Sequence, residues 1–432
     1  MSDNIQKDLT IPIIARVEGE GALHLKIHEG KISQLELSIY EPPRLFEKFL
    51  EGRAPNEVID AVARICGICP VAYQMSAVQA MEHIFEMPVT PWVHEMRRLF
   101  YCGEWMESHA LHIHMLTAPD FLRYPSVIAM AKDHPDIVKR GMHLHGLGLM
   151  LMTLLGKRSV HPVGACVGGF YAAPKISAVQ EVLAQFKKSL PLAQELVLWS
   201  ASLPLAKVTQ EFTSVCLRHP HEYPMNEGRI VSDRGLDIDI SEFDNYLKES
   251  QVPYSTALQC HLQGKSYLVG PLARLNLNHH LLPAEVHDIL KEGNITFPTQ
   301  NMFHSVIGRS VEIYYAMLEA IRIMENYVYP PTPHSPITPR AGVGFGCTEA
   351  PRGLLWHRYE FNDEGLVASS RIVPPTSQNQ ARIEEDLWHS LMAFGLDHSD
   401  DDLRFHSEMV IRNYDPCISC STHFLQLKVE RS

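Results

Sequence analysis

The chain carries two stretches that decide its fold, RICGICP at residues 64–70 and DPCISCSTH at residues 415–423. In each, a Cys-x-x-Cys turn aims two thiolates at one point, and two such turns together make a four-sulfur cage for a metal. A structural zinc site and a thioredoxin-like redox pair share this spacing and stay open. The long separation disfavours a zinc ribbon, whose cysteines stand close together in sequence.

Helical periodicity dominates the chain between these stretches. Apolar residues at three- and four-residue spacing predict helices over 58–66, 74–85, 93–116, 137–155, 177–203, 302–327 and 379–396. Alternation with glycine punctuation predicts a small antiparallel sheet over 11–40, and short strands are expected over 340–373. The predicted fold class is mainly α with small β-sheets (α+β), built on a core of long helices.

One domain is expected over residues 1–432, in four segments. These are a small β region (11–43), a helical core with the first cysteine pair (44–204), a mixed peripheral region (205–300), and a helix with strands and the second pair (301–432).

The composition excludes several classes of protein. A net charge of -12 disfavours a nucleic-acid partner, because a phosphate backbone attracts a basic face. No apolar run is long enough to span a membrane. The first residues lack the basic and apolar regions of a secretory signal, so a cytoplasmic location is expected. Of nine cysteines, five lack partner spacing and are expected to be buried apolar residues: Cys102, Cys166, Cys216, Cys260 and Cys347.

Three further blocks accompany the cysteine pairs in order. They are RVEG at 16–19, HALH at 109–112 leading to Asp120, and EAPRG at 349–353 with His357 beyond. Together the five blocks resemble the nickel-iron hydrogenase large (catalytic) subunit family. The stretch PVAYQMSAVQAME, from Pro70, resembles its soluble cytoplasmic NAD(P)-linked branch, including the sulfhydrogenase alpha subunits.

The resemblance implies a buried nickel-iron centre that cleaves dihydrogen reversibly and heterolytically to protons and electrons. Cys66 and Cys417 would be terminal nickel ligands, while Cys69 and Cys420 would bridge to an iron carrying carbonyl and cyanide. Soft thiolates suit nickel in low oxidation states.

The resemblance also implies roles for residues beside the centre. Without the resemblance, each of these residues would be interpreted as a surface carboxylate, a member of an ion pair or a core residue. Glu18 would relay protons, and Arg352 would lie over the metals with Asp120 and Asp415 as expected partners. Three further residues would line the pocket of the iron's diatomic ligands: Pro351, Thr376 and Ser377. The family's usual tryptophan at the next position is Gln378 here.

The resemblance also implies a second metal site, and the sequence departs from the family pattern at two places. Glu47 and His423 would bind a magnesium or iron ion, with waters completing a six-coordinate shell. Tyr73 stands where the family usually has a histidine that hydrogen-bonds a cluster sulfur. Family members commonly lose a C-terminal tail after the histidine that matches His423, whereas this sequence continues to Ser432.

Electrons must leave through partners, because the chain has no further cysteine clusters for iron-sulfur centres. An iron-sulfur small subunit and flavin-bearing NAD(P)-reducing subunits are expected. The alternative functions are a dihydrogen-sensing regulatory hydrogenase, a non-catalytic scaffold like the related subunit of respiratory complex I, and a structural zinc protein.

Overall fold

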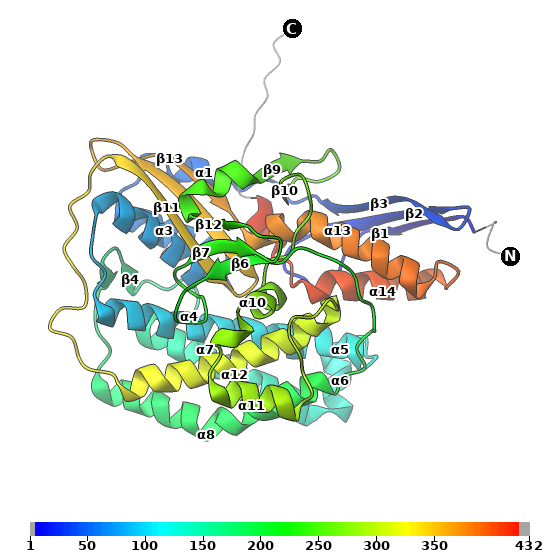
Figure 1. Ribbon diagram of the computed structural model, residues 1–432, viewed down its shortest axis with the longest axis horizontal. Coiled ribbons are helices and arrows are strands. Elements are labelled where there is room, and N and C mark those ends of the chain that lie inside the picture. The colour runs from blue at the N-terminus through cyan, green and yellow to red at the C-terminus, as the bar shows by residue number, and fades with distance from the viewer. Residues whose placement is uncertain (1–4, 423–432) are drawn as a thin grey trace, which may run out of the picture.

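A computed structural model describes residues 5–422, and a bundle of long helices forms its base (Figure 1). The bundle consists of α4 (Pro91–Leu111), α7 (Pro135–Gly156), α8 (Ile176–Ala201) and α12 (Ser305–Glu325). Each presents apolar residues to one large shared core, which includes Trp105, Leu151, Leu196 and Val311. The predicted fold class is confirmed.

Proline fixes where many of these helices begin. Proline is the first residue of α3 (Pro70–Phe85), α4, α7 and α13 (Pro375–Phe394). Its ring presets the helical φ angle, and the first turn needs no donor from it. The periodicity placed these starts a few residues late because the first turn of each helix adds little to the pattern.

Two predicted helix ends differ from the structure. The helix expected over 58–66 is α2 (Pro55–Val62), which stops before the cysteine turn. The helix expected over 93–116 ends at Leu111 and continues as a π-helix over His112–Thr117, followed by α5 (Ala118–Phe121). The Thr117 hydroxyl donates to the carbonyls of His112 and Ile113 there, at 3.2 and 3.3 Å. Such side-chain bonding and the wider π turn shift the residues that follow.

The N-terminal sheet extends away from the bundle, beside the last two helices (Figure 1). Strands β1 (Lys7–Ile11), β2 (Gly21–His28) and β3 (Lys31–Ile39) pair antiparallel in that order, as predicted. Leu25 and Ile27 pack against Leu391 of α13 and Leu403 of α14 (Asp400–Asn413). Helix α14 was not predicted, although its capping residue Ser399, which accepts a hydrogen bond from the Asp402 amide, was a usable signal.

A second antiparallel sheet lies against α3. It consists of β11 (Gly342–Ala350), β12 (Gly353–Phe361) and β13 (Val367–Val373), longer than the short strands expected. Gly346 of β11 is needed at this contact, because a Cβ there would lie 1.9 Å from the Ser76 carbonyl oxygen. Residues 350–353, which connect β11 to β12, carry Arg352.

The segment 205–300 is mixed, as predicted, but part of it is central. Its sheets are formed by β6 (Val215–Arg218), β7 (Arg229–Ser232) and β8 (Asp237–Ile238), and by β9 (Leu247–Gln251) with β10 (Leu258–Leu262). Its helices are α9 (Phe243–Tyr246), α10 (Pro271–Asn278) and α11 (Ala284–Glu292). Helix α10 is largely buried and carries Arg274, which is fully buried, so this part is not peripheral. The division into four segments otherwise stays a prediction.

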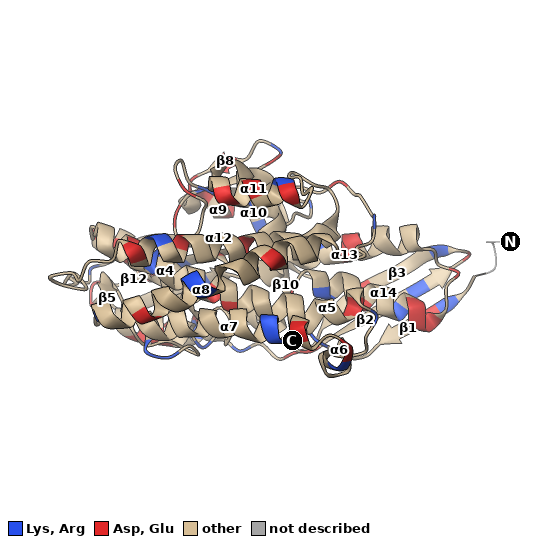
Figure 2. Ribbon diagram, turned by 90° about the horizontal axis from the view of Figure 1, so that it is seen from below, with Lys and Arg blue, Asp and Glu red and all other residues tan. Residues whose placement is uncertain are grey.

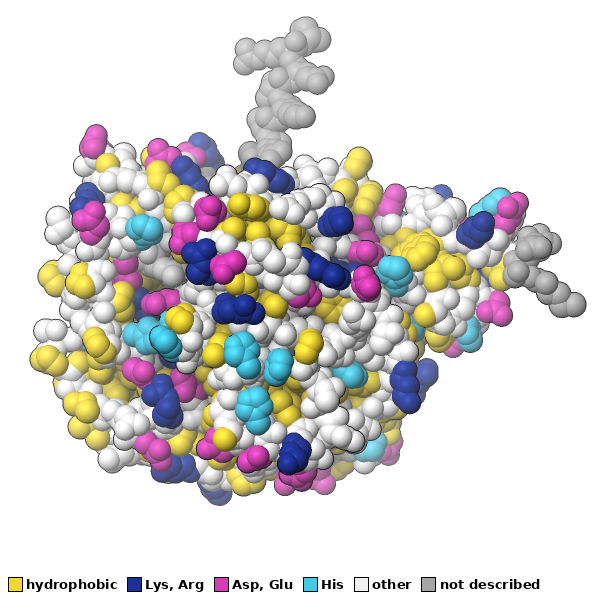
Figure 3. All heavy atoms as spheres, viewed as in Figure 1, with side chains coloured by type: hydrophobic (Ala, Val, Ile, Leu, Met, Phe, Trp, Pro, Cys, Tyr) yellow, Lys and Arg dark blue, Asp and Glu magenta, His cyan; other side chains and the backbone are white. Residues whose placement is uncertain are grey.

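The surface mixes charges of both signs. Acidic and basic residues are interspersed along the helices in Figure 2, and apolar and charged side chains mix on the face in Figure 3. Among residues 5–422, no helix has the length and apolarity that a membrane span requires.

Candidate metal centre

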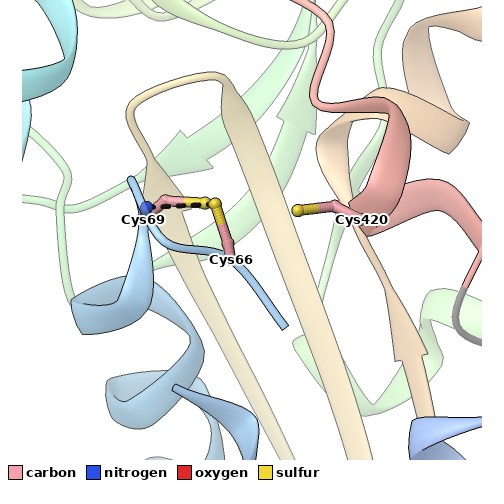
Figure 4. A group of neighbouring side chains, drawn as sticks. All are labelled: Cys66, Cys69 and Cys420. Atoms are coloured by element: carbon pink, nitrogen blue, oxygen red, sulfur yellow. Dashed lines mark hydrogen bonds between the residues drawn. The ribbon is translucent and has the colours of Figure 1, made fainter. Parts of the chain in front are cut away.

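The structure brings the two cysteine pairs together in the interior. The sulfur atoms of Cys66 and Cys417 lie 3.6 Å apart, and those of Cys417 and Cys420 lie 2.7 Å apart. The sulfurs of Cys66, Cys69 and Cys420 all lie within 4.8 Å of one another. All four side chains are buried and none forms a disulfide. In Figure 4, Cys420 points toward the Cys66–Cys69 turn from the opposite side.

The first pair lies in the turn between α2 and α3. Cys69 caps α3, and its amide donates to the Cys66 sulfur at 3.1 Å. His161 donates from Nδ1 to the Ala63 carbonyl at 2.8 Å and so holds the backbone just before the turn. Arg44 donates to the carbonyls of Ile65 and Ser419, and thereby ties the two cysteine turns to each other.

The second pair follows a sharp change of direction at Asp415, whose φ is 54°. The segment then pairs with the N-terminal part of the chain, because the Ile418 amide donates to the Glu18 carbonyl at 3.0 Å. The Cys417 amide donates to Thr376 Oγ1 at 2.9 Å. Cys420 lies in a short 3-10 helix, Ile418–Thr422. Two distant segments, at Glu18 and at Thr376, therefore fix the second pair.

Burial controls the charge of the thiols. It raises the pKa of Cys69 and Cys420, whereas hydrogen bonds to the neighbouring sulfurs outweigh burial at Cys66 and lower its pKa. A thiolate is therefore favoured at one sulfur, and further ionisation in so small a buried volume needs a compensating cation. The donor set fits a metal ion with an affinity for sulfur.

Arg352 lies beside the sulfurs and is held by Asp415. Its Nε donates to the Asp415 carbonyl at 2.7 Å and its Nη2 donates to the Asp415 carboxylate at 3.0 Å. The expected pairing with Asp120 is wrong: that carboxylate accepts from Arg412 at 2.7 and 3.0 Å, and also from Arg16. Asp120 has two guanidinium partners already, so it ties the RVEG block and α14 to α5.

A buried ion-pair network that the sequence did not reveal positions the turn before Arg352. Arg274 on α10 donates to the carbonyls of Ala350 and Pro351 at 2.9 and 3.1 Å. Its Nη2 also contacts Glu312 on α12 at 2.7 Å, and its Nη1 contacts Glu349 at 3.0 Å. An arginine on α10 and a glutamate on α12 give no sequence motif; a charged residue among apolar ones was the only available signal.

The remaining predicted residues lie around the second pair. The Glu18 carboxylate accepts from the Ser419 amide at 3.1 Å, and its side chain is half-buried. The Ser377 hydroxyl donates to the Pro374 carbonyl at 3.0 Å, so its proton is already engaged. Thr376 accepts from Cys417 and keeps its own hydroxyl proton. Pro351 is buried in the turn that Arg274 holds.

Glu47 lies in α1 (Phe46–Leu50) and is half-buried, and its Oε1 accepts from the Ile372 amide at 2.8 Å. Burial raises its pKa to about 7. His423 and the tail Phe424 to Ser432 lie outside the described residues. The neighbouring Thr422 carbonyl accepts from the Arg44 amide at 2.6 Å, which brings the end of the described chain to the residues just before α1.

Tyr73, which replaces the family's usual histidine, is fully buried on α3. Its hydroxyl has no hydrogen-bond partner within residues 5–422. Its ring lies 5.7 Å from that of His357, measured between centroids. Burial raises the pKa of Tyr73, and the negative charges of the cysteines raise it further. The phenol is thus neutral and its donor is available.

Two glutamates on α4 also lie near the sulfurs and were missed. Glu104 accepts from the amides of Val71 and Ala72, at 2.5 and 3.1 Å, and so caps the start of α3. Glu107, one turn later, is buried with one oxygen unpartnered in the described part of the chain. The five other cysteines are buried and free, as predicted.

Comparison with known proteins identifies the family. The nickel-dependent hydrogenase family profile matches residues 44–140 and 236–423. The alpha subunit of sulfhydrogenase 1 from Pyrococcus furiosus is 30% identical over 98% of this chain and 100% of its own length. The alpha subunit of sulfhydrogenase 2 from the same organism is 30% identical over 95% of this chain and 98% of its own.

A solved structure agrees with these relatives. An NAD+-reducing [NiFe]-hydrogenase in the H2-reduced state superposes with a TM-score of 0.87, covering 96% of this chain and 99% of that chain at 24% identity. At this identity the likeness shows the fold. The predicted family and the predicted likeness to sulfhydrogenase alpha subunits are confirmed, and the chain belongs to the nickel-dependent hydrogenase family.

Proposed function

We propose that this chain is the catalytic large subunit of a nickel-iron hydrogenase, with Cys66 and Cys417 as terminal nickel ligands and Cys69 and Cys420 as bridges to iron. The observation that carries the proposal is the convergence of four buried cysteines, none of them in a disulfide, from both ends of the chain. Soft sulfur donors suit a nickel-iron pair. When bound, this pair supplies the redox chemistry that separates dihydrogen into protons and electrons.

Side chains around the metals would stabilise charge, transfer protons and hold the iron's ligands. Arg352, anchored by Asp415, places a permanent positive charge beside the thiolates and stabilises the charge that develops there. Glu18 is half-buried and contacts the Cys417–Cys420 segment, so it can move a proton between the site and the surface. Thr376 and the backbone of the Pro351 turn offer donors to carbonyl and cyanide ligands on the iron.

A magnesium or iron ion at Glu47 and His423 belongs to the same proposal. Burial makes the Glu47 carboxyl costly to ionise even with the Ile372 amide and Arg371 beside it, and a cation would offset that cost. The Thr422 carbonyl accepts from the Arg44 amide, so the described part of the chain ends close to the start of α1.

Electrons would leave at the exposed side of the first cysteine turn. Gly67 is exposed between two buried ligands, and a Cβ there would meet nothing within 4 Å. Within residues 5–422, the site cysteines form the only group of three or more metal-ligating side chains. We propose that an iron-sulfur small subunit covers this turn and that flavin-bearing subunits pass electrons to NAD(P). The expected cytoplasmic location stays a prediction.

Metal analysis with infrared spectroscopy tests the proposal. The anaerobically purified wild-type chain should contain one nickel and show carbonyl and cyanide stretches, with dihydrogen-dependent dye reduction. Cys66→Ser should lose nickel, whereas Cys102→Ala, which removes a buried cysteine outside the site, should keep it. Zinc alone refutes the proposal. A nickel-iron spectrum with very slow turnover and a bound kinase favours the sensor, and absence of any metal favours the scaffold.

A further inference from the structure

Glu107 on α4 connects the interior beside the sulfurs to the protein surface. Its residue is 7% exposed, and its Oε2 atom is buried with no hydrogen-bond partner among residues 5–422. Its other carboxylate oxygen, Oε1, lies 3.8 Å from Nδ1 of His145 on α7. The His145 side chain is 28% exposed, so the two residues form a step from interior to solvent.

The close crossing of α4 and α7 fixes this arrangement. A Cβ on Gly148 would lie 2.6 Å from the Glu107 amide nitrogen and 2.6 Å from the Gly103 carbonyl oxygen. Because the two helices lie this close, His145 Nδ1 reaches the Glu107 backbone carbonyl, at 3.1 Å. A carbonyl can only accept, so Nδ1 carries a proton and Nε2 of the neutral ring is a proton acceptor.

The inner neighbours of Glu107 are the groups of the metal site. Burial raises the pKa of Glu107 to about 8; Arg352 opposes this, while the charges of Cys66 and Asp415 add to it. Nη1 of Arg352 also has no hydrogen-bond partner in the described chain. Glu104, the nearest carboxylate on the same helix, is engaged in capping α3 and does not compete. A buried donor and a buried acceptor are thus left without partners near one site, which native proteins rarely tolerate without a role.

From this arrangement we propose that Glu107 transfers protons between the cysteine site and solvent beside His145, as a second route in addition to Glu18. The inference rests on the proposed function. A proton released at the site binds Oε2 of the ionised carboxylate, and one proton then leaves Oε1 to solvent water beside His145. No electron moves, and Glu107 returns to its starting charge.

The test compares Glu107→Gln, which keeps the shape but cannot ionise, with the wild-type complex. Nickel content and the carbonyl and cyanide bands should be unchanged. Hydrogen–deuterium exchange with solvent should fall about tenfold, less than the roughly 100- to 10,000-fold typical of a single proton-transfer group, because the Glu18 route remains. The alkaline limb of the pH profile of this exchange, expected near pH 8 in the wild type, should shift in the variant. Glu95→Gln, on the surface of the same helix, is the matched control.

An independent readout needs no turnover. The infrared band of a protonated carboxyl group should disappear as the pH of the wild-type protein rises through about 8, and it should be missing in Glu107→Gln. Glu18→Gln should retain residual exchange that the double variant loses.

Three outcomes overturn the inference: wild-type exchange and pH profile in Glu107→Gln, a carboxyl band that survives this substitution, or complete loss of exchange in Glu18→Gln alone. Absence of nickel and of diatomic bands from the wild type would instead overturn the proposed function.

Discussion

At the scale of single residues, the site depends on a guanidinium that makes two directed bonds to one aspartate. Arg352 reaches both the carbonyl and the carboxylate of Asp415, and both residues are buried. Asp415 itself adopts a left-handed backbone conformation immediately before the second cysteine pair. The same residue therefore turns the chain toward the sulfurs and orients the cation beside them.

Replacing Arg352 by Lys should lower turnover by about 100- to 1000-fold, because an ammonium keeps the charge but cannot make both bonds of the planar fork. Nickel content should stay at the wild-type level, since no ligand is removed. Dihydrogen-dependent dye reduction per nickel measures the effect. Arg98→Lys is the control, since Arg98 is also buried but binds Glu319 and Tyr315 on the bundle. Equal losses in both variants would contradict a specific role for Arg352.

At the scale of secondary-structure elements, close helix contacts and helix-capping residues set the geometry. The α4–α7 crossing requires a glycine at position 148, and the pairing of α13 with α14 encloses a stack of Phe394 and His406, whose ring centroids lie 4.3 Å apart. Each contact gives a test that does not depend on the metal.

Gly148→Ala should destabilise the protein by about 1–3 kcal/mol or more, because the added methyl group has backbone on two sides and the helices must separate. Gly146→Ala is the matched control on the same helix: a Cβ there meets nothing within 4 Å. That substitution should stabilise by about 0.5–1 kcal/mol through helix propensity. Urea unfolding of the two variants measures both values. Equal effects would contradict the close crossing.

The α13–α14 contact should weaken in acid. Burial lowers the pKa of His406 from 6.5 to about 4, with smaller contributions in the same direction from His398 and Arg123. A lowered pKa means that the folded state prefers the neutral ring, so its stabilisation is present above pH 6.5 and is lost as the pH falls toward 4. The loss is on the order of 3 kcal/mol at most.

His406→Gln, which can still hydrogen-bond Ser390, should flatten the dependence of unfolding free energy on pH between 6.5 and 4. Denaturant titrations at several pH values measure it. A variant that loses stability in acid as steeply as the wild type would show that another group is responsible.

At the scale of the whole molecule, the site closes a loop between the two ends of the chain. Cys66 and Cys417 are 351 positions apart, and the segments that carry them are joined by Arg44 and by the pairing of Glu18 with Ile418. A metal bound to both pairs adds a cross-link to an arrangement that the protein already forms.

Metal loading should therefore raise the free energy of unfolding by about 6 kcal/mol, the value that loop-closure entropy gives for a cross-link of this span that persists in the unfolded chain. Calorimetry of nickel-loaded and metal-free chains measures the difference. Cys420→Ser should remove most of it, whereas Cys260→Ala should change only the baseline stability. An identical thermal midpoint with and without metal would show that the centre does not bridge the two ends.

The sequence by itself determined the family and the helical fold class, and it predicted the four sulfur ligands, because sequence motifs and apolar periodicity are local and can be recognised without knowledge of the fold. It also placed Arg352 beside Asp415, since both lie in motifs. Helix α14 and the π-helix at 112–117 were missed because capping and side-chain bonding, not apolar periodicity, mark them.

Only the tertiary structure decided which charged groups meet. Asp120 binds Arg412 and Arg16 instead of Arg352, Arg274 holds the Pro351 turn, and Glu107 lies beside His145. These pairings join residues from different elements. Which residues pair depends on how the helices cross and on which oxygen atoms lie within hydrogen-bond distance after packing. A motif fixes the type of residue at a position, whereas the distance and the dielectric around that residue arise only when the whole chain is packed.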